Sequence, residues 1–256
     1  MHLRLPSRSV TCRAVIFDKD GTLVGLHGTL LTLGHARARA MAEIAGPDAA
    51  AAWEQAVGAD LSRERIDPDG PLSLAPRRDE LLVAASALYR LGHPWDEARA
   101  LALAAYDRAD ALMQPPYGAQ LLPGIAGMLH ALHDRGALLA IATTDRGWRA
   151  ERSLAMLEVG SLFGAMIGAD DVAHGKPAPD MVLLACERLR CRPEEALVVG
   201  DSPTDLQMGR AAAAAACIGV TTGLNPAEKL APLADAVLSS AACLVDLLTA
   251  KEHRSL

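Results

Sequence analysis

The sequence predicts an α/β protein with a doubly wound parallel sheet, interrupted by an inserted all-helical segment. Three observations favour this class. Short β-prone runs recur along the chain, each main run ends in a polar cluster, and the later runs follow helix-like segments. Alternation of strand and helix is typical of βαβ units and therefore of a parallel sheet. We expect a Rossmann-like core, in which ligands bind beyond the carboxyl ends of the strands.

The first strand is expected at Arg13–Phe17 (RAVIF), where an apolar run ends at the Asp20-Gly21 turn signal. The later elements alternate in the same way. Helices are expected at 125–135 and 179–190, and further strands at 137–142 (ALLAIA), 165–167, 196–199 (ALVV), 215–220 and 236–238. The runs ALLAIA and ALVV end at Thr143-Thr144-Asp145 and Gly200-Asp201-Ser202, which puts polar groups at the same edge of the sheet.

Between about residues 30 and 116 apolar residues recur at helical spacing, and no strand is convincing. Helices are expected at 30–44, 49–57, 79–91 and 94–113. Gly25, Gly28 and the stretch 114–118 (QPPYG) mark the ends of this insertion, because proline cannot continue a helix and glycine permits a bend. We therefore expect a core domain of residues 1–28 and 117–256, and a helical domain of residues 29–116 joined through hinges.

Composition favours a small-molecule partner. With 31 acidic and 25 basic residues the formal charge is −6, so nothing indicates binding to nucleic acid or to an anionic membrane. No apolar run approaches the ~18–20 residues that span a bilayer, and the first twelve residues are polar, so we expect a cytoplasmic protein. The five cysteines are odd in number and lack close pairing, which favours reduced thiols. The oligomeric state is left open.

Acidic residues gather at two of the strand ends. Asp18 and Asp20 flank Lys19 after the first strand, Asp201 and Asp205 lie in GDSPTD, and Lys176 lies in HGKPAPD before a helix. Each piece has an ordinary structural explanation, as an Asp-rich turn, a helix N-cap or a solvated lysine. Four carboxylates around one lysine, however, would need a compensating cation, and carboxylate oxygens suit Mg²⁺.

Four motifs in order make the sequence resemble the haloacid-dehalogenase-like hydrolase superfamily, near its phosphoglycolate-phosphatase-like branch. They are FDKDGTLV, Thr143 in LLAIATTD, Lys176 in GKPAPD, and GDSPTD, and the resemblance covers nearly the whole chain. It implies that Asp18 is a nucleophile that forms an aspartyl phosphate, and that Asp20 is general acid and then general base. Thr143 would donate its hydroxyl to a phosphoryl oxygen, and Lys176 would neutralise developing charge.

The resemblance also implies a metal and a cap. Mg²⁺ would bind Asp18, Asp201, the backbone carbonyl of Asp20 and, directly or through water, Asp205. The helical domain would be a mobile helical cap. Two places depart from the usual branch pattern: Gly25-Leu26-His27 replaces an expected Asp or Ser, and Thr144-Asp145 replaces an expected Asn. Roles for His27 and Lys19 are left open.

The leading hypothesis is a Mg²⁺-dependent phosphatase acting on a small phosphorylated metabolite through an aspartyl-phosphate intermediate. Asp20 argues against a dehalogenase, because the dehalogenases of the superfamily lack this second aspartate. A phosphomutase of the same fold and a non-catalytic binding protein remain alternatives. Arg63, Arg65, Arg77 and Arg78, in the proline-rich segment 60–80, either belong to a solvated linker or meet a second anionic group on the substrate.

Overall fold

The computed structural model describes residues 1–113 and 120–249. The chain divides into two compact units, Met1–Leu26 with Ala119–Leu256, and His27–Gly118. Each is described by itself below. The hinge expected at 114–118, and with it the expected boundary between residues 116 and 117, lies outside the described residues.

A six-stranded parallel sheet forms the centre of the first unit, which confirms the predicted fold class. The strand order is β10-β9-β8-β3-β6-β7. The six strands lie within two residues of the expected bounds: β3 (Ala14–Phe17), β6 (Leu138–Ala142), β7 (Phe163–Ile167), β8 (Ala196–Gly200), β9 (Ala216–Val220) and β10 (Ala236–Leu238). Strand β3 pairs with β6 on one side and β8 on the other, so its end occupies the middle of the sheet edge.

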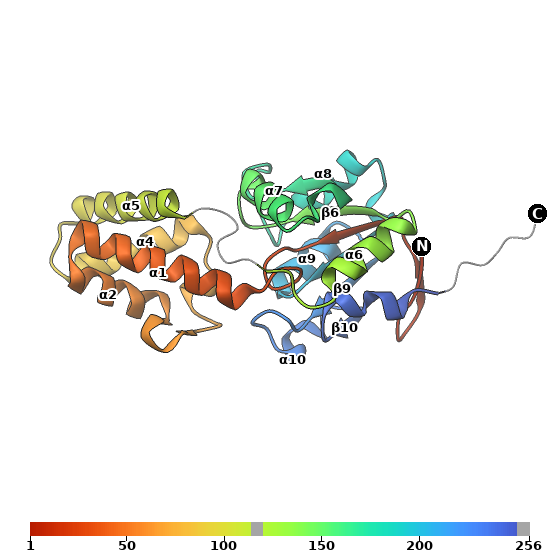
Figure 1. Cartoon of the computed structure of the whole chain (residues 1–256), viewed down its shortest axis with the longest axis horizontal. Helices are drawn as coiled ribbons and strands as arrows, with labels where there is room; N and C mark the ends of the chain where they lie inside the picture. The colour runs from red at the N-terminus through yellow and green to blue at the C-terminus, as the bar shows by residue number, and fades with distance from the viewer. Residues whose placement is uncertain (114–119, 250–256) are drawn as a thin grey trace, which may run out of the picture. The chain divides into compact units, whose positions relative to one another are not determined.

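Helices cover both faces of this sheet, as Figure 1 shows. Their bounds are α6 (Ile125–Asp134), α7 (Gly147–Met156), α8 (Asp180–Leu189), α9 (Pro203–Ala211) and α10 (Ala227–Leu230), with 3₁₀ turns η2 (Gly160–Leu162), η3 (Pro193–Glu195) and η4 (Ala241–Leu247). Val15 and Phe17 pack into a core shared with α6 and η4, while Ala14 and Ile16 pack into a second core with α8 and α9. The sheet is thus buried on both faces, as all-parallel sheets usually are.

A short antiparallel hairpin precedes the sheet and was not predicted. It pairs β1 (His2–Arg4) with β2 (Ser9–Thr11) and buries Leu3 in the core beside α6. The backbone N–H of Thr249 donates to the carbonyl of His2 at 3.0 Å. Each of these strands has a single apolar residue between polar ones (HLR and SVT), so neither forms an apolar run of the kind that marks the strands of the sheet.

The chain leaves the first unit and returns to it along adjacent paths. The N–H of Gly25 donates to the carbonyl of Gln120 at 3.0 Å, and the N–H of Leu122 donates to the carbonyl of Leu23 at 2.9 Å. These hydrogen bonds hold the outgoing segment 23–25 against the returning segment 120–122, and so they fix the loop that follows β3. Gly28, which was expected to mark a hinge, instead lies in the first turn of α1, where glycine is tolerated.

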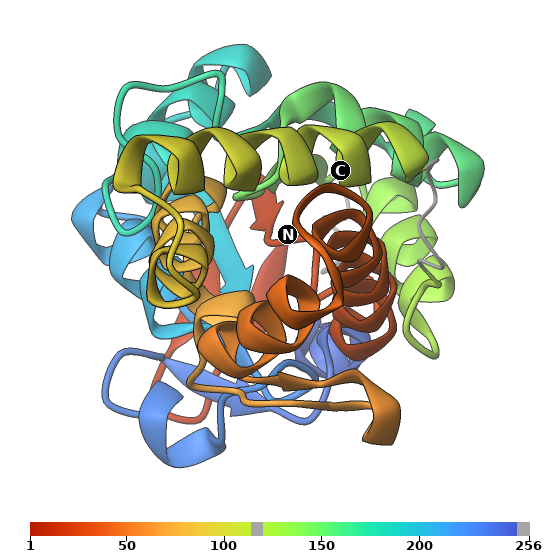
Figure 2. The same cartoon turned by 90° about the vertical axis from the view of Figure 1, so that its left-hand side faces the viewer.

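The second unit is mostly helical, as expected. Its helices are α1 (Leu26–Ala45), α2 (Pro47–Val57), α3 (Pro71–Leu74), α4 (Arg77–Arg90) and α5 (Trp95–Leu112), with the 3₁₀ turn η1 (Leu61–Arg63). The expectation of no strand is wrong, because β4 (Ala59–Asp60) pairs with β5 (Arg65–Ile66). These strands have two residues each, which leaves no periodic signal in the sequence. Figure 2 shows α1 nearly end-on and α5 running across the view.

A polar network lies inside this helical core. Arg37 and Glu80 form a buried ion pair, and the Arg37 guanidinium stacks over the Tyr106 ring at 4.5 Å. The Trp53 indole N–H donates to the Tyr106 hydroxyl at 3.0 Å. Small side chains such as Ala84, together with those of α5, pack around these groups. The network specifies how the helices pair, because each buried polar group needs its partner.

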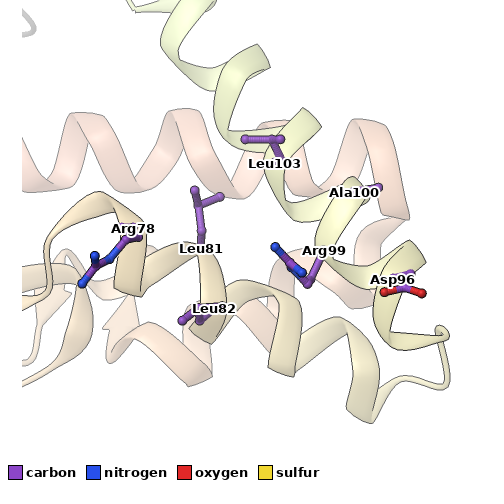
Figure 3. Close-up of a pocket in the computed structure, with 7 residues that line it drawn as sticks. All are labelled: Arg78, Leu81, Leu82, Asp96, Arg99, Ala100 and Leu103. Atoms are coloured by element: carbon purple, nitrogen blue, oxygen red, sulfur yellow. The ribbon is translucent and has the colours of Figure 1, made fainter.

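A groove of about 540 Å³ lies between α4 and α5. Figure 3 shows its lining, with Leu82 and Leu103 between Arg78 at one end and Asp96 at the other. Of the candidate residues named from the sequence it contains Arg78, but none of the expected catalytic or metal-binding residues lines it. In the described part of the chain, no helix is both long and apolar enough to cross a membrane.

Candidate active site

Three neighbouring strands of the sheet end in polar residues. Asp18 follows β3, Thr143 follows β6 and Asp201 follows β8. The N–H of Asp18 donates to the carbonyl of Val199 at 2.9 Å, and the N–H of Thr143 donates to the carbonyl of Ile167 at 2.9 Å. Because these strands are parallel and adjacent, their side chains emerge at one edge of the sheet.

Three of the four expected acidic side chains form one buried cluster. Carboxylate oxygens of Asp18, Asp201 and Asp205 all lie within 4.8 Å of one another. The side chain of Asp20 is not part of this group, since its Oδ2 lies 2.5 Å from Nζ of Lys19. The Asp20 side chain thus lies apart from the three side chains grouped for a cation.

Lys176 provides the positive charge of the cluster. Its Nζ lies 2.6 Å from Oδ1 of Asp18 and 2.5 Å from Oδ1 of Asp205. Only 3% of its side chain is exposed, so it is not the solvated lysine that its position before Pro177 would suggest. It reaches the cluster from the loop that precedes α8.

The electrostatics of the cluster follow from burial and crowding. Burial raises the pKa of Asp18 to about 6; Lys176 opposes this rise, and the charge of Asp205 adds to it. The pKa of Asp201 is raised well above its usual value, first by burial and then by the charges of Asp18 and Asp205. Burial lowers the pKa of Lys176, but the two carboxylates that it contacts outweigh this effect and raise it overall. One ammonium therefore faces three carboxylates that resist joint ionisation.

Asp205 has both carboxylate oxygens engaged. Oδ1 meets Lys176, while Oδ2 accepts from the hydroxyl of Ser202 at 2.7 Å and from its backbone N–H at 3.0 Å. Ser202 is the N-cap of α9 and Asp205 completes a capping box. The structural explanation for GDSPTD is therefore true, and Asp205 supports Lys176 in addition.

Thr143 is not a helix cap, because α7 begins at Gly147 with Arg146 in the N-cap position. Its Oγ1 accepts a hydrogen bond from the N–H of Asp145 at 3.1 Å. That bond uses an acceptor lone pair and leaves the hydroxyl hydrogen available for a ligand oxygen. Asp18 and Asp20 do not cap a helix either, since the next helix begins at Leu26.

The sequence marks Gly21 as a turn residue but does not show that two glycines, Gly21 and Gly223, approach Asp201. A Cβ on Gly223 would lie 1.7 Å from Oδ2 of Asp201, and one on Gly21 would lie 2.6 Å from the same atom. Gly21 also has φ of +90°, which other residues rarely adopt. The hydroxyl of Thr222 donates to the carbonyl of Gly21 at 2.6 Å, and the hydroxyl of Thr22 donates to Oδ1 of Asp201 at 3.2 Å. The loop after β9 thus closes against the first motif around Asp201.

A second charged group lies beside the first motif. Lys19 is buried, with Nζ at 2.5 Å from Asp20 and 4.0 Å from Asp145. The acidic residue Asp145 after the second motif was the one sequence signal for a cationic partner nearby. Nothing in the sequence around Lys19 shows that this lysine is buried.

The remaining candidates lie in the helical unit. His27 is exposed on α1. Arg63 pairs with Asp60, Arg78 with Asp79, and Arg77 with both Asp107 and Asp110. Arg65 is exposed on β5. The hypothesis of a substrate contact from these arginines stays a prediction, and its best remaining member is Arg65.

The cluster of Asp18, Asp201 and Asp205 fits a hard divalent cation. Its donors are carboxylate oxygens, the ligands that Mg²⁺ prefers. Burial and the charges of the neighbouring carboxylates raise the pKa values of Asp18 and Asp201, and a bound cation would oppose both effects. Asp201 is the best candidate for a direct ligand, because Asp205 is already engaged by Lys176 and Ser202.

Comparison with known proteins identifies the family. The profile of the haloacid dehalogenase-like hydrolases matches residues 12–213. This chain belongs to that family. The phosphoglycolate phosphatase of Salmonella typhimurium is 31% identical over 224 residues, which cover 86% of this chain and 85% of the relative. A Dickeya dadantii protein named as phosphatase IndB is 32% identical over 217 residues, or 84% of each chain. The family match and these relatives confirm the predicted enzyme class, a phosphatase.

Solved structures agree on the fold. A haloacid dehalogenase-like hydrolase from Bacteroides fragilis has a TM-score of 0.67 at 23% identity, covering 91% of this chain and all of the other. A Thermotoga maritima structure named for β-phosphoglucomutase has a TM-score of 0.64 at 23% identity, covering 91% of this chain and 97% of the other. At this identity the likeness shows the fold, which both phosphatases and mutases use.

Proposed function

We propose that this phosphatase hydrolyses a small phosphate monoester of the phosphoglycolate kind, with Mg²⁺ and through an aspartyl phosphate on Asp18. One observation carries the proposal. A buried carboxylate at the centre of the sheet edge, Asp18, is held by Lys176 beside Asp201, while a separate carboxylate, Asp20, lies outside the cluster. This arrangement supports separate groups for the nucleophile, the cation site and the proton carrier.

In the first step an oxygen of Asp18 attacks phosphorus, and the bond from phosphorus to the leaving alcohol breaks. Lys176 fixes Asp18 through Oδ1 at 2.6 Å and opposes the negative charge that develops on the phosphoryl group. The hydroxyl of Thr143 donates to a phosphoryl oxygen. Asp20 transfers its proton to the oxygen of the departing alcohol, so the alcohol leaves neutral.

In the second step Asp20, now ionised, takes a proton from a water molecule. That water attacks phosphorus, the bond from phosphorus to Asp18 breaks, and inorganic phosphate leaves. Mg²⁺, when bound by Asp18, Asp201 and the backbone carbonyl of Asp20, would neutralise the charge of the phosphoryl oxygens. The cluster holds too many carboxylates for one lysine, which supports this assignment of the metal.

The helical unit is proposed as the cap that selects the substrate, because the roles assigned to the residues at the sheet edge involve only the phosphoryl group and the oxygen of the leaving alcohol. The relatives named for phosphoglycolate phosphatase motivate the substrate class. The cytoplasmic location stays a prediction from the sequence, and the oligomeric state stays open.

Hydrolysis of a panel of phosphate monoesters, ranked by kcat/KM with Mg²⁺ and with a chelator, tests this proposal. We expect turnover that requires Mg²⁺ and is highest for phosphoglycolate or a similar small anionic monoester. Transfer of phosphate back to a sugar phosphate, without net release of phosphate, would establish a mutase instead. No turnover with any metal or substrate would contradict the enzyme.

A further inference from the structure

Lys19 stands between the two aspartates of the first motif, and the proposed function gives it no role. It is nonetheless buried, with 5% of its side chain exposed. Lysine is almost never buried without a partner, because an isolated ammonium loses its hydration. Burial lowers the pKa of Lys19, but Asp20 and Asp145 outweigh that effect and raise it overall. The side chain is thus a buried cation held by two carboxylates.

One oxygen of Asp20 is occupied by this lysine and the other is open. Nζ of Lys19 lies 2.5 Å from Oδ2 of Asp20. Oδ1 of Asp20 is buried and has no hydrogen-bond partner among the residues that the structure describes. A buried carboxylate oxygen without a partner is costly, so its presence indicates a position reserved for a ligand atom. The contact with Lys19 fixes the plane of the carboxylate and therefore where Oδ1 points.

Lys19 is itself held by a fixed anchor. The N–H of Asp145 donates to Thr143, its carbonyl accepts from the N–H of Ala169 at 2.9 Å, and its Oδ1 accepts from the N–H of Arg146 at 2.8 Å. These bonds immobilise Asp145 and leave Oδ2 as the oxygen nearest Lys19, at 4.0 Å. The first and second motif loops are joined through this lysine.

We propose that Lys19, anchored by Asp145, is a positioning residue that orients Asp20 so that Oδ1 faces the leaving-group oxygen. The inference rests on the proposed function, in which Asp20 carries the proton. The ion pairs of Lys19 are with Asp20 and Asp145, and the charge of Asp18 affects its pKa less than these two carboxylates do, so its main effect falls on proton transfer rather than on cation binding.

Leaving-group chemistry tests this role sharply. An alkyl phosphate such as phosphoglycolate expels a poor leaving group that needs a proton, whereas 4-nitrophenyl phosphate expels a stable phenolate that does not. The parameter kcat/KM reports steps up to release of the alcohol, so it isolates the first proton transfer. The variants are Lys19→Met, which keeps the apolar stem in place, Lys19→Arg, which restores a cation, and Asp145→Asn.

We expect Lys19→Met to lower kcat/KM for phosphoglycolate by about 10- to 100-fold, a part of the ~10²–10⁴ that general acid–base catalysis commonly contributes. The fall for 4-nitrophenyl phosphate should be about threefold or less on the same reasoning. Lys19→Arg should recover part of the loss, and Asp145→Asn should show the same substrate contrast more weakly. The Mg²⁺ concentration for half-maximal activity should not change.

Lys229→Met is the matched control, because Lys229 is exposed on α10 and outside the site, and its kinetics should equal those of the unmodified enzyme. Equal losses on both substrates would overturn the inference, and so would unchanged kinetics in Lys19→Met. If Lys19→Met does not fold, Asp145→Asn and Lys19→Arg still decide the question through the substrate contrast. Failure of the unmodified enzyme to hydrolyse either substrate would instead refute the proposed function.

Discussion

Replacing Lys176 by methionine removes the ammonium that contacts the acidic cluster, the only one to do so within residues 1–113 and 120–249, while keeping a similar volume. Nζ of Lys176 lies within 2.6 Å of both Asp18 and Asp205, and the exposed fractions of the three side chains are 3%, 10% and 2%. Removing one partner of a buried ion pair commonly costs about 3–5 kcal/mol, because the remaining charge is left unpaired. For a chain of this size the expected fall in Tm is roughly 6–20 °C.

The dependence of this loss on pH identifies its cause. The pKa of Asp18 is about 6 in the folded protein and 3.8 without the fold, so its carboxyl is ionised in the native state only above about pH 6. When Asp18 is protonated, its carboxyl is neutral and the Lys176 ammonium stabilises it less. The destabilisation by Lys176→Met should therefore be smaller at pH 5, where Asp18 is largely protonated and chiefly the contact with Asp205 is lost, than at pH 8, where both carboxylate contacts are lost.

Denaturant unfolding of the metal-free protein at the two pH values measures the effect, with Lys229→Met as the control that removes an exposed lysine. Added Mg²⁺ should restore part of the lost stability at pH 8, because the cation replaces the missing charge. A variant as stable as the unmodified protein at pH 8 would refute the reasoning. A loss of the same size at both pH values would show that packing, and not charge, makes the contribution.

Three further outcomes are expected. Mg²⁺ affinity should rise with pH through about 6 as Asp18 loses its proton, and Mg²⁺ binding should release protons. Calorimetry in two buffers of different ionisation enthalpy detects this release. A Mg²⁺ affinity that does not depend on pH would contradict the prediction. Gly223→Ala should weaken Mg²⁺ binding at least ~10-fold, because the added Cβ would displace Asp201 from its ligand position. The control is Gly127→Ala on α6, where a Cβ meets open space and should raise stability by up to ~1 kcal/mol. Equal losses of Mg²⁺ affinity in the two variants would contradict the prediction. Asp201→Asn should leave the Tm in chelator unchanged or higher and abolish the rise in Tm on adding Mg²⁺; a sharp drop in chelator would make Asp201 structural.

The fold was predictable where the sequence carries a repeated signal. Runs such as RAVIF and ALVV are apolar, short and bounded by turn residues, so strand positions and the polar strand ends followed from them. The parallel pairing then placed Asp18, Thr143 and Asp201 at one edge. Short elements without an apolar run, such as β1 (HLR) and β4 (AD), carry no such signal.

The charged partners within the site were not predictable for a different reason. A lysine in a sequence is solvated by default, and the burial of Lys19 depends on Asp145, which the fold brings from another strand end. The approach of Gly223 to Asp201 depends likewise on how the loop after β9 closes. Such contacts are set by tertiary packing, and a single sequence records them only as isolated residues.

The central claim is that Asp18 becomes phosphorylated during turnover. Asp20→Asn provides the most direct test with 4-nitrophenyl phosphate, because its leaving group needs no proton while hydrolysis of the intermediate still needs the base that is lost. We predict a burst of nitrophenolate stoichiometric with enzyme, and a phosphoryl group on Asp18 in the acid-quenched protein analysed by peptide mass spectrometry. The same experiment on Asp18→Asn should give neither. Covalent phosphate on another residue, or a burst from Asp18→Asn, would contradict the account.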